Sequence, residues 1–252
     1  MPGIFVAQDY IMKKLILTAF ILCSYLFTNA QTTQTTKDWR KETLERPGDH
    51  IMINLTSDHW SGAPDSISSR ETGFSRGLGF AIMIDKPFKS NPRWSIALGL
   101  GVNGSNMFFK NTSVDIKSLS TVLPFRNVDS ADHFKKYKLV NVYAEIPIEL
   151  RYSFNPEKHS SWKVAFGIKV GTLLDAHTKG KTLQNANGTN INSYTLKEKK
   201  KQFFNSTRFA ATARVGIGSF SLIGTYSLTG LLKDGAGPNI KPWQIGLCIS
   251  GL

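Results

Sequence analysis

The chain has 252 residues, including 21 glycines and 16 phenylalanines, and it carries a formal net charge of +13. This length accommodates one or two domains, and the abundance of glycine and phenylalanine favours tightly packed β structure. The chain has two cysteines. Because Cys23 falls in the leader described next, a disulfide-rich scaffold is excluded for the mature protein.

Residues 12–30 have the layout of a secretory signal peptide. A short basic start, Met12-Lys13-Lys14, precedes a largely apolar stretch, and Ala30 provides a small residue before a predicted cleavage site at Gln31. The apolar stretch spans about 13 residues, whereas a transmembrane helix needs roughly 20. We therefore expect an upstream extension and signal peptide at residues 1–30, a flexible lead at 31–48 and the folded domain at 49–252.

Eight segments of the expected folded domain alternate apolar and polar residues with a period of two. Successive side chains of a strand point to opposite faces, so each segment has one apolar and one polar face. Only helices and closed barrels satisfy every backbone group in lipid. The pattern predicts an all-β fold, an antiparallel up-and-down transmembrane β-barrel of about eight strands. These segments are residues 51–56, 77–84, 94–103, 140–154, 162–171, 208–217, 220–228 and 243–250.

The connections between these segments alternate between short and long. Outer-membrane barrels join their strands by short periplasmic turns and longer outward loops, whereas long structureless loops are uncommon in compact soluble domains. The alternation therefore favours a barrel exported to an outer membrane, with both termini on the periplasmic side. The short joins are residues 85–92, 155–160 and 218–219, the long ones are residues 57–74, 105–138 and 175–204, and the last, residues 230–241, is of moderate length.

The segment at residues 140–154 separates its two faces most clearly. Its even-numbered residues are apolar, whereas Glu145 and Glu149 fall on the opposite face. A lysine or arginine facing lipid near the midplane costs roughly 2–4 kcal/mol, so the charged face of the barrel is expected to line the lumen. Eight strands leave an interior only wide enough for side chains, and buried charges need partners. We predict that these charges form a structural network, and the alternative is a path for protons or small solutes. The predicted network consists of Glu145, Glu149, Arg151, Lys169, Arg208 and Arg214.

Proline and aromatic residues refine the strand pattern. Pro147 lacks a backbone donor, so we expect a local bulge or bend at this position. Aromatic residues lie near the strand ends, where transmembrane barrels carry girdles at both membrane interfaces. The girdle candidates are Trp94, Tyr152, Phe154, Trp162, Phe209, Phe220 and Trp243.

One predicted strand in mid-chain reads Tyr143-Ala144-Glu145-Ile146-Pro147-Ile148-Glu149-Leu150-Arg151-Tyr152. It resembles the Tyr-x-Glu-Ile-Pro-x-x-x-Arg/Lys-Tyr strand of the PorT-type outer-membrane β-barrel family of Bacteroidetes-like bacteria. The resemblance extends to the layout of residues 49–252 and to a leader ending in Asn29-Ala30. It implies a small outer-membrane barrel, and some relatives are linked to type IX secretion. Leu252 departs from the aromatic residue with which such barrels often end.

Motifs for metal binding, nucleophilic catalysis and cofactor binding do not stand out in the sequence. There is no HExxH, CxxC or G-x-S-x-G spacing, and Cys248 is interpreted as a small lumen filler. Gly77-x-Gly79 and Gly99-x-Gly101 lie in predicted strands that no helix follows, which argues against a dinucleotide site. We expect a non-enzymatic protein without cofactor or metal. The histidines, which lie mostly in loops or at strand ends, are His50, His59, His133, His159 and His177.

A run of lysines before the sixth segment offers a contact for a charged partner. Because the chain is expected to be exported, lipopolysaccharide phosphates suit its positive charge better than nucleic acid does. Envelope or secretion proteins are expected to bind the loops at residues 105–138 and 175–204. The alternatives are an outer-membrane lipid-modifying enzyme, a pore, or a soluble lipocalin-like binder whose apolar faces line a cavity. The predicted lipopolysaccharide contact consists of Lys197, Lys199, Lys200 and Lys201.

Overall fold

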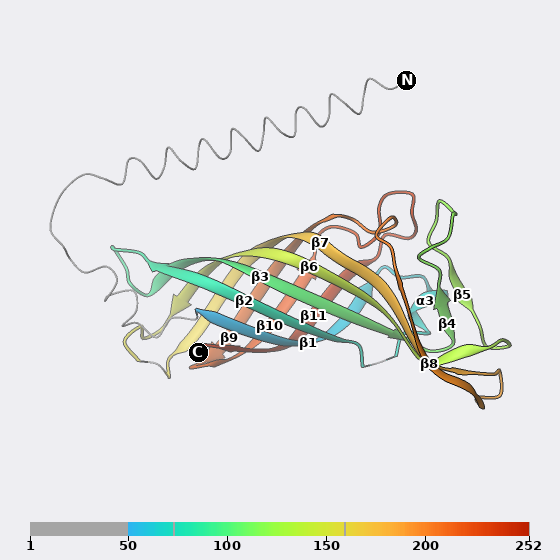
Figure 1. The fold of residues 1–252 in the computed structure, drawn as a ribbon. Helices are drawn as coiled ribbons and strands as arrows, with labels where there is room; N and C mark the ends of the chain where they lie inside the picture. The colour runs from blue at the N-terminus through green and yellow to red at the C-terminus, as the bar shows by residue number, and fades with distance from the viewer. Residues whose placement is uncertain (1–49, 73, 159, 252) are drawn as a thin grey trace, which may run out of the picture. The chain divides into compact units, whose positions relative to one another are not determined.

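The computed structural model describes residues 50–72, 74–158 and 160–251. The expected signal peptide and lead, the cleavage site before Gln31, His159 and Leu252 lie outside these described residues. In the described part, eight strands pair in the order β6-β3-β2-β1-β11-β10-β9-β7, and a β6–β7 pairing closes the ring (Figure 1). The strands are β1 (Ile51–Ser61), β2 (Arg76–Pro87), β3 (Trp94–Phe109), β6 (His133–Ser153), β7 (Trp162–Gln184), β9 (Thr207–Ile217), β10 (Phe220–Ser227) and β11 (Lys241–Ser250).

All pairings in this ring are antiparallel, which confirms the predicted fold class. Closure removes the sheet edges, so every strand of the ring has a partner on both sides. No helix in the described ranges is long and apolar enough to cross a bilayer. Four further elements lie outside the ring: α3 (Asp65–Ser68), β4 (Thr112–Val114), β5 (Phe125–Asn127) and β8 (Asn190–Lys199).

The barrel packs inside out relative to a soluble protein. Its outward face is apolar, as at Phe166, whose side chain is 63% exposed, and at Ile146 and Val215. Its inward face holds charged residues such as Glu149, which is 1% exposed. This arrangement confirms the predicted assignment of the two faces. The lipocalin-like alternative is wrong, because that fold would place the same apolar residues around an internal cavity.

The two ends of the barrel differ, as predicted from the lengths of the connections. One end carries the short joins at residues 88–93, 154–161 and 218–219 together with the start of β1 and the end of β11. The other end carries the long connections, and α3, β4, β5 and β8 gather there (Figure 1). We call these the short-turn end and the long-loop end.

Aromatic residues surround the short-turn end. The rings of Trp94 and Tyr152 lie 4.9 Å apart on β3 and β6, and Tyr152 contacts Phe154 at 5.1 Å. Trp162 and Phe220 lie exposed at the ends of their own strands. These aromatic side chains lie at the strand ends, which is where transmembrane barrels carry the aromatic girdle of the membrane interface.

The strands beside the long-loop end run further than the sequence pattern predicts. The loop expected at residues 175–204 is largely wrong, because β7 continues to Gln184 and returns as the β8 strand. The loop expected at residues 105–138 is likewise shortened, since β3 extends to Phe109 and β6 begins at His133. The inward residues of these extensions, such as Leu139 and Ala176, are buried. Their outward residues, such as Lys136 and Lys179, lack the apolar character that lipid imposes.

Pro147 produces a small gap in one ladder. The β6–β7 register continues through Pro147 and Lys169, whereas the β3–β6 ladder passes from the Leu98–Ile148 pair directly to Gly101. This gap follows from the missing N–H of proline. A stronger irregularity lies nearer the long-loop end of β6, where the register between β6 and β7 shifts between residues 142 and 143.

Candidate functional site

The lumen contains two groups of ion pairs. The first surrounds Glu145 of β6: Arg208 Nη1 donates to its Oε1 at 3.2 Å, and Lys169 Nζ lies 3.7 Å from its Oε2. The Arg208 guanidinium also lies 5.5 Å from the centre of the Tyr143 ring. The carboxylate therefore lies between cations from β7 and β9, and it ties three strands together across the interior.

The second group surrounds Glu149, which lies four residues beyond Glu145 on β6, nearer the short-turn end. Arg151 Nε donates to Glu149 Oε2 at 2.9 Å, and Arg214 Nη2 lies 3.3 Å from the same oxygen. Arg151 also lies 3.8 Å from Asp85 of β2. Gly167 is the β7 partner of Glu149, and a Cβ there would overlap backbone and press on the glutamate side chain. The structure thus brings the predicted lumen residues together in two groups, and it adds Asp85.

An apolar layer and an amide cluster fill most of the remaining lumen. Gln244 Nε2 donates to Asp58 Oδ1 at 2.8 Å, and Thr56 donates to the same carboxylate at 2.7 Å. Two small hollows inside the barrel each measure about 10 Å³, which is about the space needed for one water molecule. The lumen is therefore filled by side chains. The apolar layer consists of Met52, Ala81, Met83, Ala97, Ile223 and Cys248.

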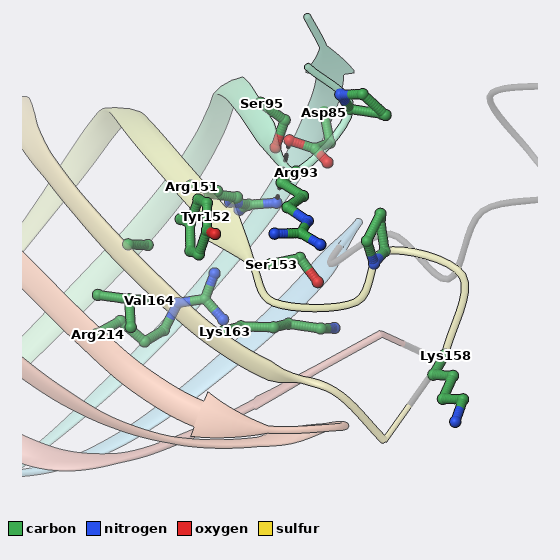
Figure 2. Close-up of a pocket in the computed structure, with 13 residues that line it drawn as sticks. Asp85, Arg93, Ser95, Arg151, Tyr152, Ser153, Lys158, Lys163, Val164 and Arg214 are labelled. Carbon is green, nitrogen blue, oxygen red and sulfur yellow. Dashed lines mark ion pairs between the residues drawn. The ribbon is translucent and has the colours of Figure 1, made fainter.

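A hollow of about 60 Å³ opens at the short-turn mouth. Figure 2 shows the side chains of Arg93, Lys163 and Arg214 around it, with the Arg151–Asp85 ion pair at its wall. Most of the charged groups lining this hollow are cations. The hollow ends at the Glu149 group, so it does not continue as an open path through the barrel.

The long loops fold into a cap with its own apolar core. Tyr137 donates its hydroxyl hydrogen to the backbone oxygen of Val114 at 2.9 Å and accepts from the Val114 N–H at 3.0 Å. Gln202 donates to the backbone oxygen of Ser118 at 2.6 Å. These bonds join β6, β4 and the segment after β8, so segments distant in the chain close over one mouth. The buried core includes Trp60, Ile67, Phe109, Val114, Ile116, Leu123, Leu139, Phe203, Phe204, Leu231, Leu232 and Ile240.

An exposed ion pair fastens the outer part of the cap. Arg70 lies 2.8 Å from Asp129, and Asn111 donates to the same carboxylate at 2.9 Å. The hydrogen bond from Arg70 is the main cause that holds the pKa of Asp129 well below its usual range. Because this pair is exposed, its contribution to stability is small.

Glu71 gives the cap a dependence on pH. Burial raises its pKa from 4.5 to about 7, and its Oε1 has no hydrogen-bond partner among the described residues. Between these two pH values the folded state holds a proton that the unfolded chain releases. We therefore expect stability to fall as the pH rises from about 4.5 to about 7. Thermal unfolding at pH 5 and pH 8 should show a smaller fall for Glu71→Gln, which should also be the more stable protein at pH 8. Equal falls in both proteins would contradict this assignment.

The histidines and acidic residues do not converge on a metal site. Among the described residues, no group of three or more His, Cys, Asp or Glu side chains could hold a metal ion. The shortest acid–imidazole contact is on β7, where His177 Nδ1 lies 3.0 Å from Asp175 Oδ2. Lys199 Nζ lies 3.0 Å from the other oxygen of that carboxylate. Asp175 is therefore shared between two basic side chains.

The four lysines predicted to contact lipopolysaccharide do not share one surface. Lys197 and Lys199 belong to β8, and alternation places them on the same face. Lys200 and Lys201 follow the strand, and Lys201 Nζ donates to the backbone oxygen of Leu173 at 3.2 Å. The run therefore divides between an outer strand and the base of the cap.

Comparisons with known proteins give two solved structures and one protein family. Two structures of the attachment invasion locus protein Ail of Yersinia pestis match this chain, with 14% and 12% identity and a TM-score of 0.31. The first of these is a complex with the heparin analogue sucrose octasulfate. Each match covers 79% of this chain and 95% of Ail. No curated protein matches. The outer membrane protein beta-barrel domain family matches residues 49–233, well over half of the chain, and the protein therefore belongs to this family of outer-membrane barrels.

Proposed function

We propose that this protein is a non-enzymatic outer-membrane barrel that presents its cap to protein partners of the envelope or of a secretion pathway. Outer-membrane barrels turn their long loops outward, so the cap faces the cell exterior and both ends of the described barrel chain face the periplasm. The likeness of residues 143–152 to PorT-type barrels favours a partner associated with type IX secretion.

The apolar tip of the cap carries this proposal. Large apolar side chains that are exposed away from the lipid-facing strands are candidates for contact with a partner. In the cap, Lys117 lies 3.7 Å from Glu198 of β8, so the loop after β4 and the β8 strand are held together. Apolar side chains on these two segments remain exposed far from the lipid-facing band. This apolar tip consists of Leu119, Val122, Ile191, Tyr194 and Leu196.

The interior of the barrel supports a structural role over transport. The two groups of ion pairs span the lumen, and the two hollows inside the barrel are each about the size of one water molecule. The cap core then covers the long-loop mouth. A solute would have to displace paired charges and a packed apolar cluster, so we expect no steady conductance.

A lipid-modifying enzyme is the second candidate, and the Asp175–His177 pair is the observation that favours it. An acid–imidazole pair is part of a hydrolytic triad when a nucleophile completes it. Here the carboxylate also binds Lys199, so it is shared between two basic side chains, whereas in a triad it would orient the imidazole alone. The proposal therefore expects no release of fatty acid from phospholipid or lipopolysaccharide.

The test combines conductance measurements in planar bilayers with site-specific photo-crosslinking in cells. The reconstituted protein should give no steady conductance in planar bilayers. A photo-crosslinking residue at Leu119, which is 98% exposed, should join an envelope protein in intact cells. The same residue at Leu100, on the lipid-facing side of β3, should give no protein adduct. Steady conductance, fatty-acid release, or equal crosslinking at both positions would contradict the proposed function.

A further inference from the structure

Lysines stand directly opposite one another on three neighbouring strands. The register pairs Lys138 of β6 with Lys179 of β7, and Lys179 with Lys197 of β8. One step further from the barrel, Lys136 pairs with Lys181. Like charges directly opposite in a sheet are destabilising, so these rungs cost stability unless an anion lies over them.

These lysines lie on the face of the sheet that meets lipid lower down. Side chains alternate along β6, so Lys136 and Lys138 share the outward side of Val142 and Ile146. Lys138 is four residues beyond Val142, or roughly 13 Å along the strand at about 3.4 Å per residue. Because barrel strands are tilted, its height above the apolar band is smaller. This is the level of the lipid headgroups.

Aromatic and cationic groups continue the surface onto β3 and β2. The Lys138 ammonium lies 5.4 Å from the centre of the Phe108 ring, and it donates to Asn106 Oδ1 at 2.7 Å. The Arg76 guanidinium lies 4.6 Å from the Phe74 ring and 5.7 Å from the Phe108 ring. Such a mixture of rings and cations suits the boundary between acyl chains and charged headgroups.

Carboxylates do not neutralise the lysine rungs. Asp175 shares their face, but it binds His177 and Lys199. Glu198 alternates onto the opposite face of β8, where it binds Lys117. The surface therefore has an excess of positive charge over its described carboxylates.

We propose that this surface, defined as Arg76, Lys136, Lys138, Lys179, Lys181 and Lys197, binds phosphate groups of lipid headgroups in the outer leaflet. This lipid site is separate from the protein-docking function proposed for the cap. The two proposals share one premise, that the long-loop end faces the cell exterior. Lipopolysaccharide is the lipid of that leaflet that carries several closely spaced phosphates. The rungs place several ammonium groups within reach of one such headgroup.

The test is binding of fluorescent lipopolysaccharide to the full chain in neutral detergent. A triple variant, Lys138→Gln, Lys179→Gln and Lys197→Gln, removes the central rung. Each lysine near a charged lipid surface contributes roughly fivefold in affinity, so the apparent Kd should rise about 100-fold. The matched control, Lys110→Gln, Lys158→Gln and Lys233→Gln, changes the net charge equally at exposed sites away from the rungs. Its Kd should stay within about threefold of the unaltered protein.

Further arms identify the ligand and protect against misfolding. Dephosphorylated lipopolysaccharide should bind as weakly to the unaltered protein as the phosphorylated form binds to the triple variant. Inorganic polyphosphate should compete poorly; strong competition would identify a soluble polyanion instead and overturn the lipid assignment.

Heat-modifiable gel mobility shows whether each variant is folded. If the triple variant does not fold, the single variant Lys179→Gln replaces it, and its affinity for lipopolysaccharide should fall about fivefold. Equal losses in the triple variant and control would also overturn the proposal. Crosslinking from Leu119 should persist in the triple variant, so the two proposals can fail separately.

Discussion

Replacing Glu149 with glutamine is expected to lower the free energy of unfolding by about 3–5 kcal/mol, the usual effect of removing one partner from a buried ion pair. Glu149 is 1% exposed, and its carboxylate binds both Arg151 at 2.9 Å and Arg214 at 3.3 Å. Glutamine keeps the volume of the side chain but removes the charge that compensates two buried guanidinium groups. The midpoint of urea unfolding in vesicles, followed by heat-modifiable gel mobility, measures the effect.

Two further variants separate the ion pairs from general effects of charge. Glu157→Gln changes an exposed acid in the short β6–β7 turn, and a surface substitution of this kind should alter stability by less than about 0.5 kcal/mol. Combining Glu149→Gln with Arg214→Met should recover part of the loss, because an apolar replacement of a buried pair is often tolerated. A Glu149→Gln protein as stable as the original would contradict the structural role of this group.

Replacing Phe204 with alanine is expected to open the cap. Phe204 is 1% exposed in the cap core, and removing a buried phenylalanine side chain costs about 3–5 kcal/mol. The loss should be local, because the cap core lies above the lipid-embedded strands. Amide hydrogen exchange should therefore accelerate in the cap, for example at the Leu123 N–H that bonds the Ala236 oxygen at 2.8 Å. The barrel strands should keep their protection.

Leu119→Ala is the matched control within the same cap. Leu119 is 98% exposed, so its truncation should change stability by less than about 0.5 kcal/mol. If Phe204→Ala left exchange in the cap unchanged, the loops would not form one packed unit. If it accelerated exchange equally in every strand, the cap and the barrel would unfold together.

The barrel could be predicted from the sequence because lipid imposes a simple rule. Strand residues that face acyl chains must be apolar and their neighbours need not be, so Ile146, Phe166 and Val215 alternate with polar or small residues. The charges of the lumen followed from the same rule. Because the β6–β7 turn is short, it sets the register that pairs Glu149 with Gly167 of β7.

The long-loop end could not be predicted because water imposes no alternation there. Residues 178–181 read Thr-Lys-Gly-Lys, which has no apolar face, yet they pair with β6 and β8. The core of the cap depends on contacts distant in the chain. Adjacent pairs such as Phe203 with Phe204 fit neither strand nor helix periodicity, and only the converging loops bury them.

Two lumen features were missed for a similar reason. Asp85 falls in a predicted turn, but β2 continues to Pro87 and brings its carboxylate within 3.8 Å of Arg151. Met83 and Ile223 are apolar residues on a face expected to be polar, and they form the apolar layer of the lumen. Alternation separates the two faces of a strand, but it does not reveal which lumen positions would form this layer.

Quenching by brominated acyl chains tests the inside-out packing most directly. A fluorescent label would be attached to Phe166→Cys or Ala165→Cys, neighbouring positions with opposite burial, in a chain also carrying Cys23→Ser and Cys248→Ala. In vesicles containing brominated lipid, the label at position 166 should be strongly quenched and the label at position 165 should not. Quenching at position 165 with none at 166 would contradict a barrel that turns its apolar face to lipid and its charges inward.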